Sequence, residues 1–175
     1  MSRVIKIRCK WCNLNNSLYV KYHDEEWCQL NLDDDYLFEM LLLESFQAGL
    51  SWECVLNKRE EFRKAYDNFN LEKICNYSDD KITELINNKK IIRNKLKIKA
   101  SINNAKIFKS IRKEYGSFRN YLKTFTKEKI IYEIDKTTNL LSDSISKDLK
   151  KRGMKFVGSV IIYSHDKECF LYKKK

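Results

Sequence analysis

The chain of 175 residues contains no proline, only four glycines and only two histidines. Proline and glycine interrupt regular structure, so their scarcity favours helices joined by short polar turns. No apolar run approaches the roughly 20 residues that a membrane-spanning helix needs, and the first eleven residues lack the apolar core of a signal peptide. We therefore expect an all-α, cytoplasmic protein without a membrane partner, folded as a single domain over residues 1–175.

Positive charge and cysteine are what the sequence has in excess. It carries 35 Lys and Arg against 24 Asp and Glu, a net charge of +11 with a pI near 9.3. Such a balance attracts phosphate polyanions, although charge alone does not identify a partner. The six cysteines, in a chain without a secretion signal, indicate reduced thiols or metal ligands and argue against a disulfide framework.

The most apolar stretch is residues 37–52, LFEMLLLESFQAGLSW. Its apolar residues recur at helical spacing around most of the circumference, which predicts a core helix. The acids at 33–35 are suited to cap its start and Gly49 to follow its end. Glu44 lies on the apolar face, where an acid costs several kcal/mol to desolvate. It is either a core-helix acid that reaches solvent or a pocket acid that holds a polar or cationic ring.

The remaining apolar periodicities predict further helices. They cover residues 53–66, 71–77, 79–88, 95–115, 117–125 and 142–152. Residues 127–141 have the weakest pattern, and Ile130–Tyr132 within them is either a short strand or a buried loop.

The predicted helix 142–152 is followed by Gly153, a tight turn, Gly158 and a second apolar run. This is the layout of a helix-hairpin-helix element. Gly158 would let the main chain approach a DNA phosphate, and the N–H groups that start the second helix would face it. The cations around this turn are Lys151, Arg152 and Lys155. An ordinary helical hairpin without a DNA role fits the same spacing.

Cysteine and histidine gather near both ends of the chain. Cys9 and Cys12 have C-x2-C spacing and His23 follows them, while His165 and Cys169 are four residues apart and would share a helix face. Together these residues could form a metal clip between the two terminal segments. Buried thiols and ordinary polar histidines are the alternative.

Several longer motifs resemble the DNA-3-methyladenine glycosylase I family, bacterial alkylation-repair enzymes of the helix-hairpin-helix type. The motifs are LYVKYHDEEW at 18–27, LFEMLLLESFQAGLSW at 37–52, IIRNKLKIKASINNA at 91–105 and LSDSISKDLKKRGMKFVGS at 141–159. The resemblance covers most of the chain. It implies a monofunctional base-excision enzyme that flips 3-methyladenine out of double-stranded DNA and hydrolyses its N-glycosidic bond, leaving an abasic site.

The resemblance also implies roles for individual residues. Glu44 would be the catalytic pocket acid and would assist electrostatically, while water attacks a bond that is already labile because the methylated base is cationic. Tyr22, Trp27 and Trp52 would hold the base by stacking and hydrogen bonding. The implied DNA contacts are Gly49, Leu50, Lys151, Arg152, Gly153, Lys155 and Gly158.

A structural zinc ion is implied as well, with Cys9, His23, His165 and Cys169 as ligands. In the family, the helix after the Tyr-Ser pair continues for about three turns before the zinc-binding histidine. Here His165 follows Ser164 directly. We interpret this as a deletion of about ten residues, which would shorten the second hairpin helix by roughly 15 Å.

Two other functions remain open from the sequence. A catalytically degenerate protein with the same fold would bind DNA without cleaving it. A zinc-stabilised protein without a DNA role would carry its positive charge for compositional reasons only. We expect the chain to act as a monomer.

Overall fold

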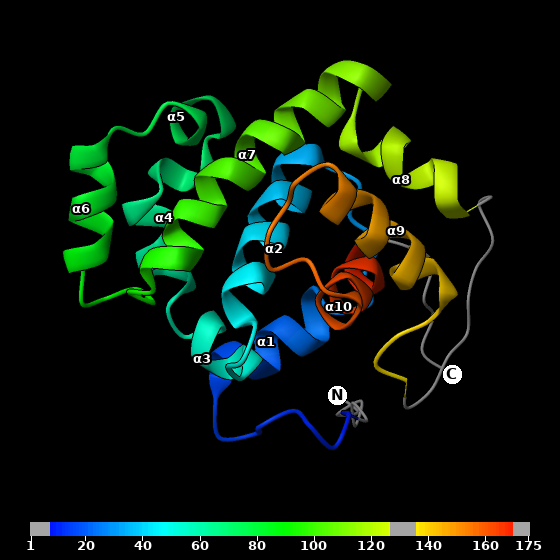
Figure 1. The fold of residues 1–175 in the computed structure, drawn as a ribbon. Coiled ribbons are helices and arrows are strands. Elements are labelled where there is room, and N and C mark those ends of the chain that lie inside the picture. The colour runs from blue at the N-terminus through cyan, green and yellow to red at the C-terminus, as the bar shows by residue number, and fades with distance from the viewer. Residues whose placement is uncertain (1–7, 127–135, 170–175) are drawn as a thin grey trace.

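The computed structural model describes residues 8–126 and 136–169, and within these ranges the chain forms helices and no β-strand. This confirms the predicted all-α class, while the possible strand at 130–132 lies outside the described residues. The elements are α1 (Ser17–Glu25), α2 (Asp34–Gln47), α3 (Trp52–Leu56), α4 (Arg59–Ala65), η1 (Asp67–Phe69), α5 (Leu71–Cys75), α6 (Asp79–Asn87), α7 (Lys95–Tyr115), α8 (Phe118–Thr126), α9 (Leu140–Lys151) and α10 (Ser159–Cys169) (Figure 1). None of these helices combines the length and apolar character needed to cross a membrane.

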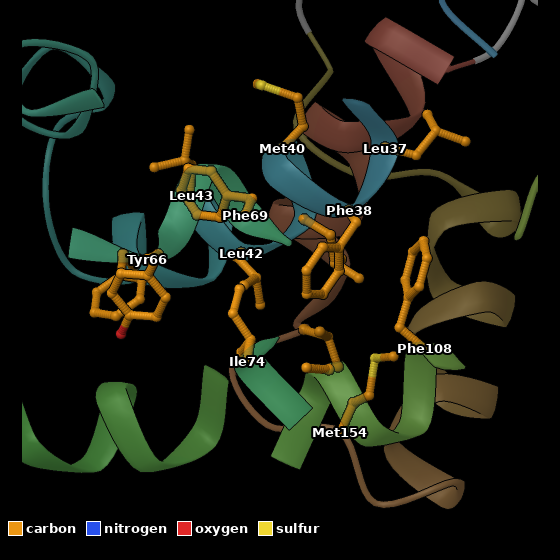
Figure 2. Packing of buried hydrophobic residues seen from close by; sticks show 14 of the residues in the cluster. Leu37, Phe38, Met40, Leu42, Leu43, Tyr66, Phe69, Ile74, Phe108 and Met154 are labelled. Carbon is orange, nitrogen blue, oxygen red and sulfur yellow. The ribbon is translucent and has the colours of Figure 1, made fainter. Parts of the chain in front are cut away.

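Helix α2 runs through the centre of the fold, and its neighbours cover it on several sides (Figure 1). Helix α2 contacts α7, where Figure 2 shows Phe38 beside Phe108, and it also contacts η1, which carries the buried Phe69. The Phe38 and Phe108 rings lie 4.9 Å apart. Each fully buried side chain of this size contributes about 1.5–3 kcal/mol to stability. The predicted core helix is therefore confirmed.

Acidic side chains fix the start of α2, as predicted. The Asp33 carboxylate accepts the N–H of Tyr36 at 2.9 Å and caps the helix. The next residue, Asp34, accepts the N–H groups of Phe118 and Arg119 at 2.9 and 3.1 Å. One short acidic segment thus satisfies N–H groups at the starts of both α2 and α8.

The predicted helix over residues 53–66 is wrong, because the chain forms two helices, α3 and α4, with a break at residues 57–58. Arg59 is almost fully buried, and its guanidinium lies 2.6 Å from both Glu26 and Glu39. The carboxylates belong to the segment after α1 and to α2. Periodicity could not reveal the break, since these partners lie 20 to 33 residues away.

A left-handed turn ends α9 and starts the connection to α10. Gly153 has φ of +97°, its N–H donates to the Lys150 carbonyl at 2.9 Å, and the Met154 N–H donates to the Leu149 carbonyl at 3.0 Å. This hydrogen-bond pair is the Schellman motif, which requires a residue that tolerates positive φ. The predicted C′ glycine is confirmed, but α9 starts two residues earlier than predicted, with Asn139 as its cap.

Helix α7 holds the turn between α9 and α10 in place. The side chain of Asn104 donates to the Lys155 carbonyl at 2.8 Å and accepts the Lys155 N–H at 2.9 Å. Asn103 donates to the Gly153 carbonyl at 2.9 Å. Because both backbone groups of Lys155 are satisfied by one buried amide, the turn has a defined position on α7.

Helix α10 runs without a break from Ser159 through His165 to Cys169, while the interpretation that about ten residues are deleted before His165 stays a prediction. His165 is 1% exposed, its Nε2 lies 3.1 Å from the Leu37 carbonyl oxygen, and its ring meets Phe118 edge-on at 6.2 Å. His165 is therefore a core residue of α10 that packs against α2 and α8.

Burial gives His165 a measurable pH signature. Desolvation lowers its pKa from 6.5 to about 4, against an opposing effect of its hydrogen bond to Leu37. Because the unfolded chain then binds this proton more readily, the free energy of unfolding should fall as the pH drops from 6.5 toward 4. Denaturant unfolding at several pH values should show a smaller fall for His165→Phe. An identical pH dependence in both proteins would refute this prediction.

Candidate active site

A small cavity of about 120 Å³ lies where the N-terminal loop, α1, α2, α3 and α10 meet. Its lining consists of Trp11, Tyr19, Tyr22, Trp27, Glu44, Gln47, Trp52 and Ser164. The cavity is well below the roughly 300–1,000 Å³ of drug-sized ligand sites, so it suits one small ring system. All four residues that the sequence predicted for the pocket are among those that line it.

Glu44 is the only acidic residue among those lining the cavity. It lies in the last turn of α2 and is 1% exposed, so it does not reach bulk solvent at the helix edge. A buried carboxyl group is costly, and proteins place one in a cavity mainly where function needs it. Of the two interpretations that the sequence left open, the structure supports the pocket acid.

Aromatic rings form the walls around this acid. Tyr22 of α1 and Trp52 of α3 have ring centroids 5.3 Å apart at 52°, and Tyr19 stacks on Tyr22 at 6.4 Å. The Trp52 ring is held at the start of α3, where Ser51 caps the helix through the Cys54 N–H. Such faces attract cationic rings, an effect that grows when the site excludes water.

The indole N–H of Trp52 is buried and has no hydrogen-bond acceptor among the described residues. Buried polar groups are nearly always satisfied, so a donor of this kind beside a cavity calls for an acceptor from a ligand. A heteroaromatic ring with nitrogen atoms in its plane can supply one.

Trp11 and Trp27 are neighbours in the lining of the cavity. Their rings meet edge-on with centroids 4.9 Å apart, and Trp11 also contacts Tyr19 at 5.3 Å. Trp11 is 41% exposed and comes from the N-terminal loop. Asn16, which caps α1, ties this loop to α3 by donating to Glu53 at 2.7 Å.

The glycines predicted to approach DNA lie at open positions. A Cβ atom on Gly49 or Gly158 would meet no other atom within 4 Å, and Gly49 has φ of +79°. Leu50, beside Gly49, is 41% exposed. The side chains of Lys151 and Lys155 are exposed near the turn between α9 and α10. These residues could all be reached by a large partner.

Arg152 differs from the other residues predicted to bind DNA, because its guanidinium is engaged within the protein. It contacts Glu114 at 2.6 Å, Asp148 at 2.7 Å and the Tyr115 hydroxyl at 3.1 Å. The hydrogen bond to Glu114 is the main reason that the pKa of Arg152 is raised. These contacts link the end of α9 to the end of α7, and the predicted DNA contact of Arg152 stays a prediction.

Comparison with known proteins identifies the family. A model of the methyladenine glycosylase family matches residues 11–172. The chain belongs to the methyladenine glycosylase family. It is 39% identical to DNA-3-methyladenine glycosylase 1 of Escherichia coli (strain K12), over 94% of this chain and 90% of that protein, and 36% identical to DNA-3-methyladenine glycosylase of Haemophilus influenzae, over 90% and 88%.

Solved structures agree with this assignment. A crystal structure of 3-methyladenine DNA glycosylase I superposes with a TM-score of 0.90 at 36% identity, covering 96% of this chain and 95% of that one. The enzyme of Staphylococcus aureus, whose structure concerns recognition of 3-methyladenine, superposes with a TM-score of 0.85 at 32% identity, covering 90% and 87%. At these identities the likeness extends to the family as well as to the fold.

Four lining residues of this methyladenine glycosylase were not predicted as site residues. Gln47 lies one turn from Glu44, and Tyr19 one turn from Tyr22, so helical spacing from the predicted residues could have found both. Trp11 and Ser164 come from the N-terminal loop and from α10. Nothing local in the sequence places those two beside Glu44.

The zinc ligands implied by the resemblance are not assembled in the described part of the chain, where no three His, Cys, Asp or Glu residues could hold a metal ion. The Cys9 N–H donates to His23 Nε2 at 3.2 Å, and His23 Nδ1 lies 2.9 Å from Asp24. His165 faces Leu37 in the core instead. The side chain of Cys169 lies outside the described residues, so zinc binding stays a prediction, while the core position of His165 argues against this residue as a ligand.

Measuring the zinc content of variants can show whether the N-terminal loop binds zinc and whether His165 takes part. If zinc is bound through the N-terminal loop, Cys9→Ser should lower both the zinc content and the melting temperature. His165→Phe should keep the zinc content of the unaltered protein, because that ring packs in the core. Elemental analysis and thermal melts on the same preparations give both values. An unchanged zinc content and melting temperature in Cys9→Ser would contradict zinc binding at the N-terminal loop.

Proposed function

We propose that this protein is a DNA-3-methyladenine glycosylase that excises 3-methyladenine from alkylated double-stranded DNA in base-excision repair. The observation that carries this function is a buried acid, Glu44, enclosed by aromatic rings in a cavity of about 120 Å³. A base inside a duplex cannot reach such a cavity, so the enzyme flips the nucleotide out of the stack. Unstacking costs a few kcal/mol, and less for a damaged base.

The cavity chemistry favours a cationic base over a neutral one. Methylation at N3 gives the adenine in DNA a positive charge, which the aromatic faces of Tyr22 and Trp52 attract. The carboxylate of Glu44 adds an opposite charge and accepts hydrogen bonds from the base. The buried Trp52 N–H can donate to a ring nitrogen. Unmodified adenine lacks the positive charge and gains less from each of these contacts.

Hydrolysis needs little acid catalysis, because the leaving base is already cationic. Water attacks the anomeric carbon of the sugar as the bond from this carbon to the base breaks. The bonding electron pair passes to the base, which leaves as neutral 3-methyladenine. The water gives its proton to solvent, and the DNA retains an abasic site. Glu44 assists electrostatically by stabilising positive charge in a cavity that excludes bulk water.

The α9–α10 hairpin and the loop after α2 supply the proposed DNA contacts. Gly158 leaves open space beside the start of α10, where backbone N–H groups can face a phosphate. Lys151 and Lys155 add exposed charge, and Gly49 and Leu50 lie at the end of the helix that carries Glu44. We expect a monomer to make all of these contacts.

A degenerate protein that only binds DNA is the less favoured function. The family comparison supports a glycosylase over most of the chain, and the acid and the aromatic residues of the cavity are all present.

The Glu44→Gln variant tests the pocket acid. This change keeps the shape of the side chain and removes its charge, so the fold should survive while release of 3-methyladenine from methylated duplex DNA falls roughly 10- to 100-fold, as for loss of one preorganised electrostatic contact. Glu60→Gln is a suitable control because Glu60 is an exposed residue of α4. Single-turnover release of free base measures both variants. Equal rates for Glu44→Gln and the unaltered protein would remove the proposed role.

A further inference from the structure

A second, larger hollow of about 460 Å³ lies beside the first turns of α7 and is separate from the base cavity. It is lined by Leu96, Lys99, Ala100, Asn103, Lys155 and Phe156, which we call the α7 patch. Leu96 is 70% exposed, which is unusual for a large apolar side chain beside a hollow. Apolar surface of this kind, rimmed by polar groups, often marks an interaction site.

The charges of the α7 patch have one sign. Lys99 and Lys155 are exposed and no acidic residue is among those that line the hollow. The first turn of α7 likewise contains no acid, and Lys95 within it is exposed. Cations at the positive end of a helix are less favourable there than acids. The arrangement works against helix stability and in favour of attracting an anionic partner.

Lys97 lies beside the α7 patch and contacts both the end of α2 and the turn between α9 and α10. Its buried ammonium group donates to the carbonyl oxygens of Phe46, at 2.8 Å, and Ala48 at the end of α2, and it lies 5.8 Å from the centre of the Phe156 ring. Figure 1 shows the turn between α9 and α10 reaching across toward α7. The α7 patch therefore adjoins the α9–α10 hairpin, while Lys97 connects it to the end of α2 before Gly49.

Phe156 is held in a backbone conformation that bulky residues rarely adopt. Its φ is +57°, in the left-handed region, although the side chain is large and aromatic. The preceding residue, Lys155, is fixed by both hydrogen bonds to Asn104. Strain of this kind persists where surrounding contacts impose it, and it gathers at functional surfaces. Here it presents the ring to the hollow beside Leu96.

We propose that the α7 patch is an additional contact for the sugar–phosphate backbone of duplex DNA, next to the segment from which the base is flipped. Leu96 and Phe156 pack against the C–H groups of deoxyribose, and Lys99 and Lys155 pair with phosphates. The single sign of charge and the continuity with the hairpin favour DNA over a protein partner. The inference rests on the proposed function, because it takes DNA as the substrate.

Binding as a function of salt tests the α7 patch. The probe is a duplex that contains a stable abasic-site analogue, titrated between 50 and 200 mM salt. Lys99→Gln should weaken binding at low salt and reduce the slope of log affinity against log salt by about 0.9, the value for one phosphate contact. Leu96→Ala should weaken binding several-fold without changing the slope. Lys113→Gln, an exposed residue in the last turn of the same helix, is the matched control and should match the unaltered protein.

Release of 3-methyladenine by the unaltered protein separates failure of this inference from failure of the proposed function. Suppose that the unaltered protein releases base, and that both patch variants bind the duplex with the same affinity and the same salt dependence as the unaltered protein. The α7 patch is then not a DNA contact, and the glycosylase function stands. A change in self-association of Leu96→Ala with unchanged DNA binding would overturn the inference in favour of a contact between copies. No release from the folded protein would reject the glycosylase function, whatever the variants bind.

Discussion

The position of one carboxyl group within an apolar helix governs much of this structure. Helix α2 is buried around most of its circumference, and its last turn places Glu44 in the wall of the 120 Å³ cavity. Such a helix must be held along its whole length, because a small shift would move the acid relative to the aromatic rings. The Asp33 cap secures its start, and Lys97 secures its end by binding the carbonyl groups of Phe46 and Ala48. Helix α2 therefore belongs both to the hydrophobic core and to the lining of the cavity.

Under the proposed function, the end of α2 links the residues that recognise the base to those that contact DNA. Beyond Glu44, the chain turns at Gly49 and exposes Leu50, and α3 then begins with the Trp52 ring of the cavity. Lys97 links the end of α2 to the start of α7 and to the turn between α9 and α10. Under the proposed function, these contacts let the backbone-binding surfaces and the base cavity keep a fixed geometry. Preorganisation of this kind reduces the cost of closing a site around its ligand.

The cations of this chain differ in whether they have partners within the protein. Arg152 belongs to the basic segment at the end of α9, yet it is engaged with Glu114 and Asp148 and links α9 to α7. Lys151 and Lys155, from the same segment, are exposed. A net charge of +11 therefore includes cations with structural partners as well as cations that can meet phosphate. Sequence alone treats them alike because one of the two acidic partners of Arg152, Glu114, lies 38 residues away.

By itself, the sequence determined the all-α class, the bounds of α7 and the central buried helix. It also indicated four residues that line the cavity, Glu44, Tyr22, Trp27 and Trp52. These features follow from helical periodicity and from motifs whose residues lie close together in the chain. Tertiary structure decided the break between α3 and α4, the placement of Trp11 and Ser164 at the cavity, and the burial of His165 against Leu37. Each of these depends on groups far apart in the chain, and packing and buried charge act between such groups without leaving a local pattern.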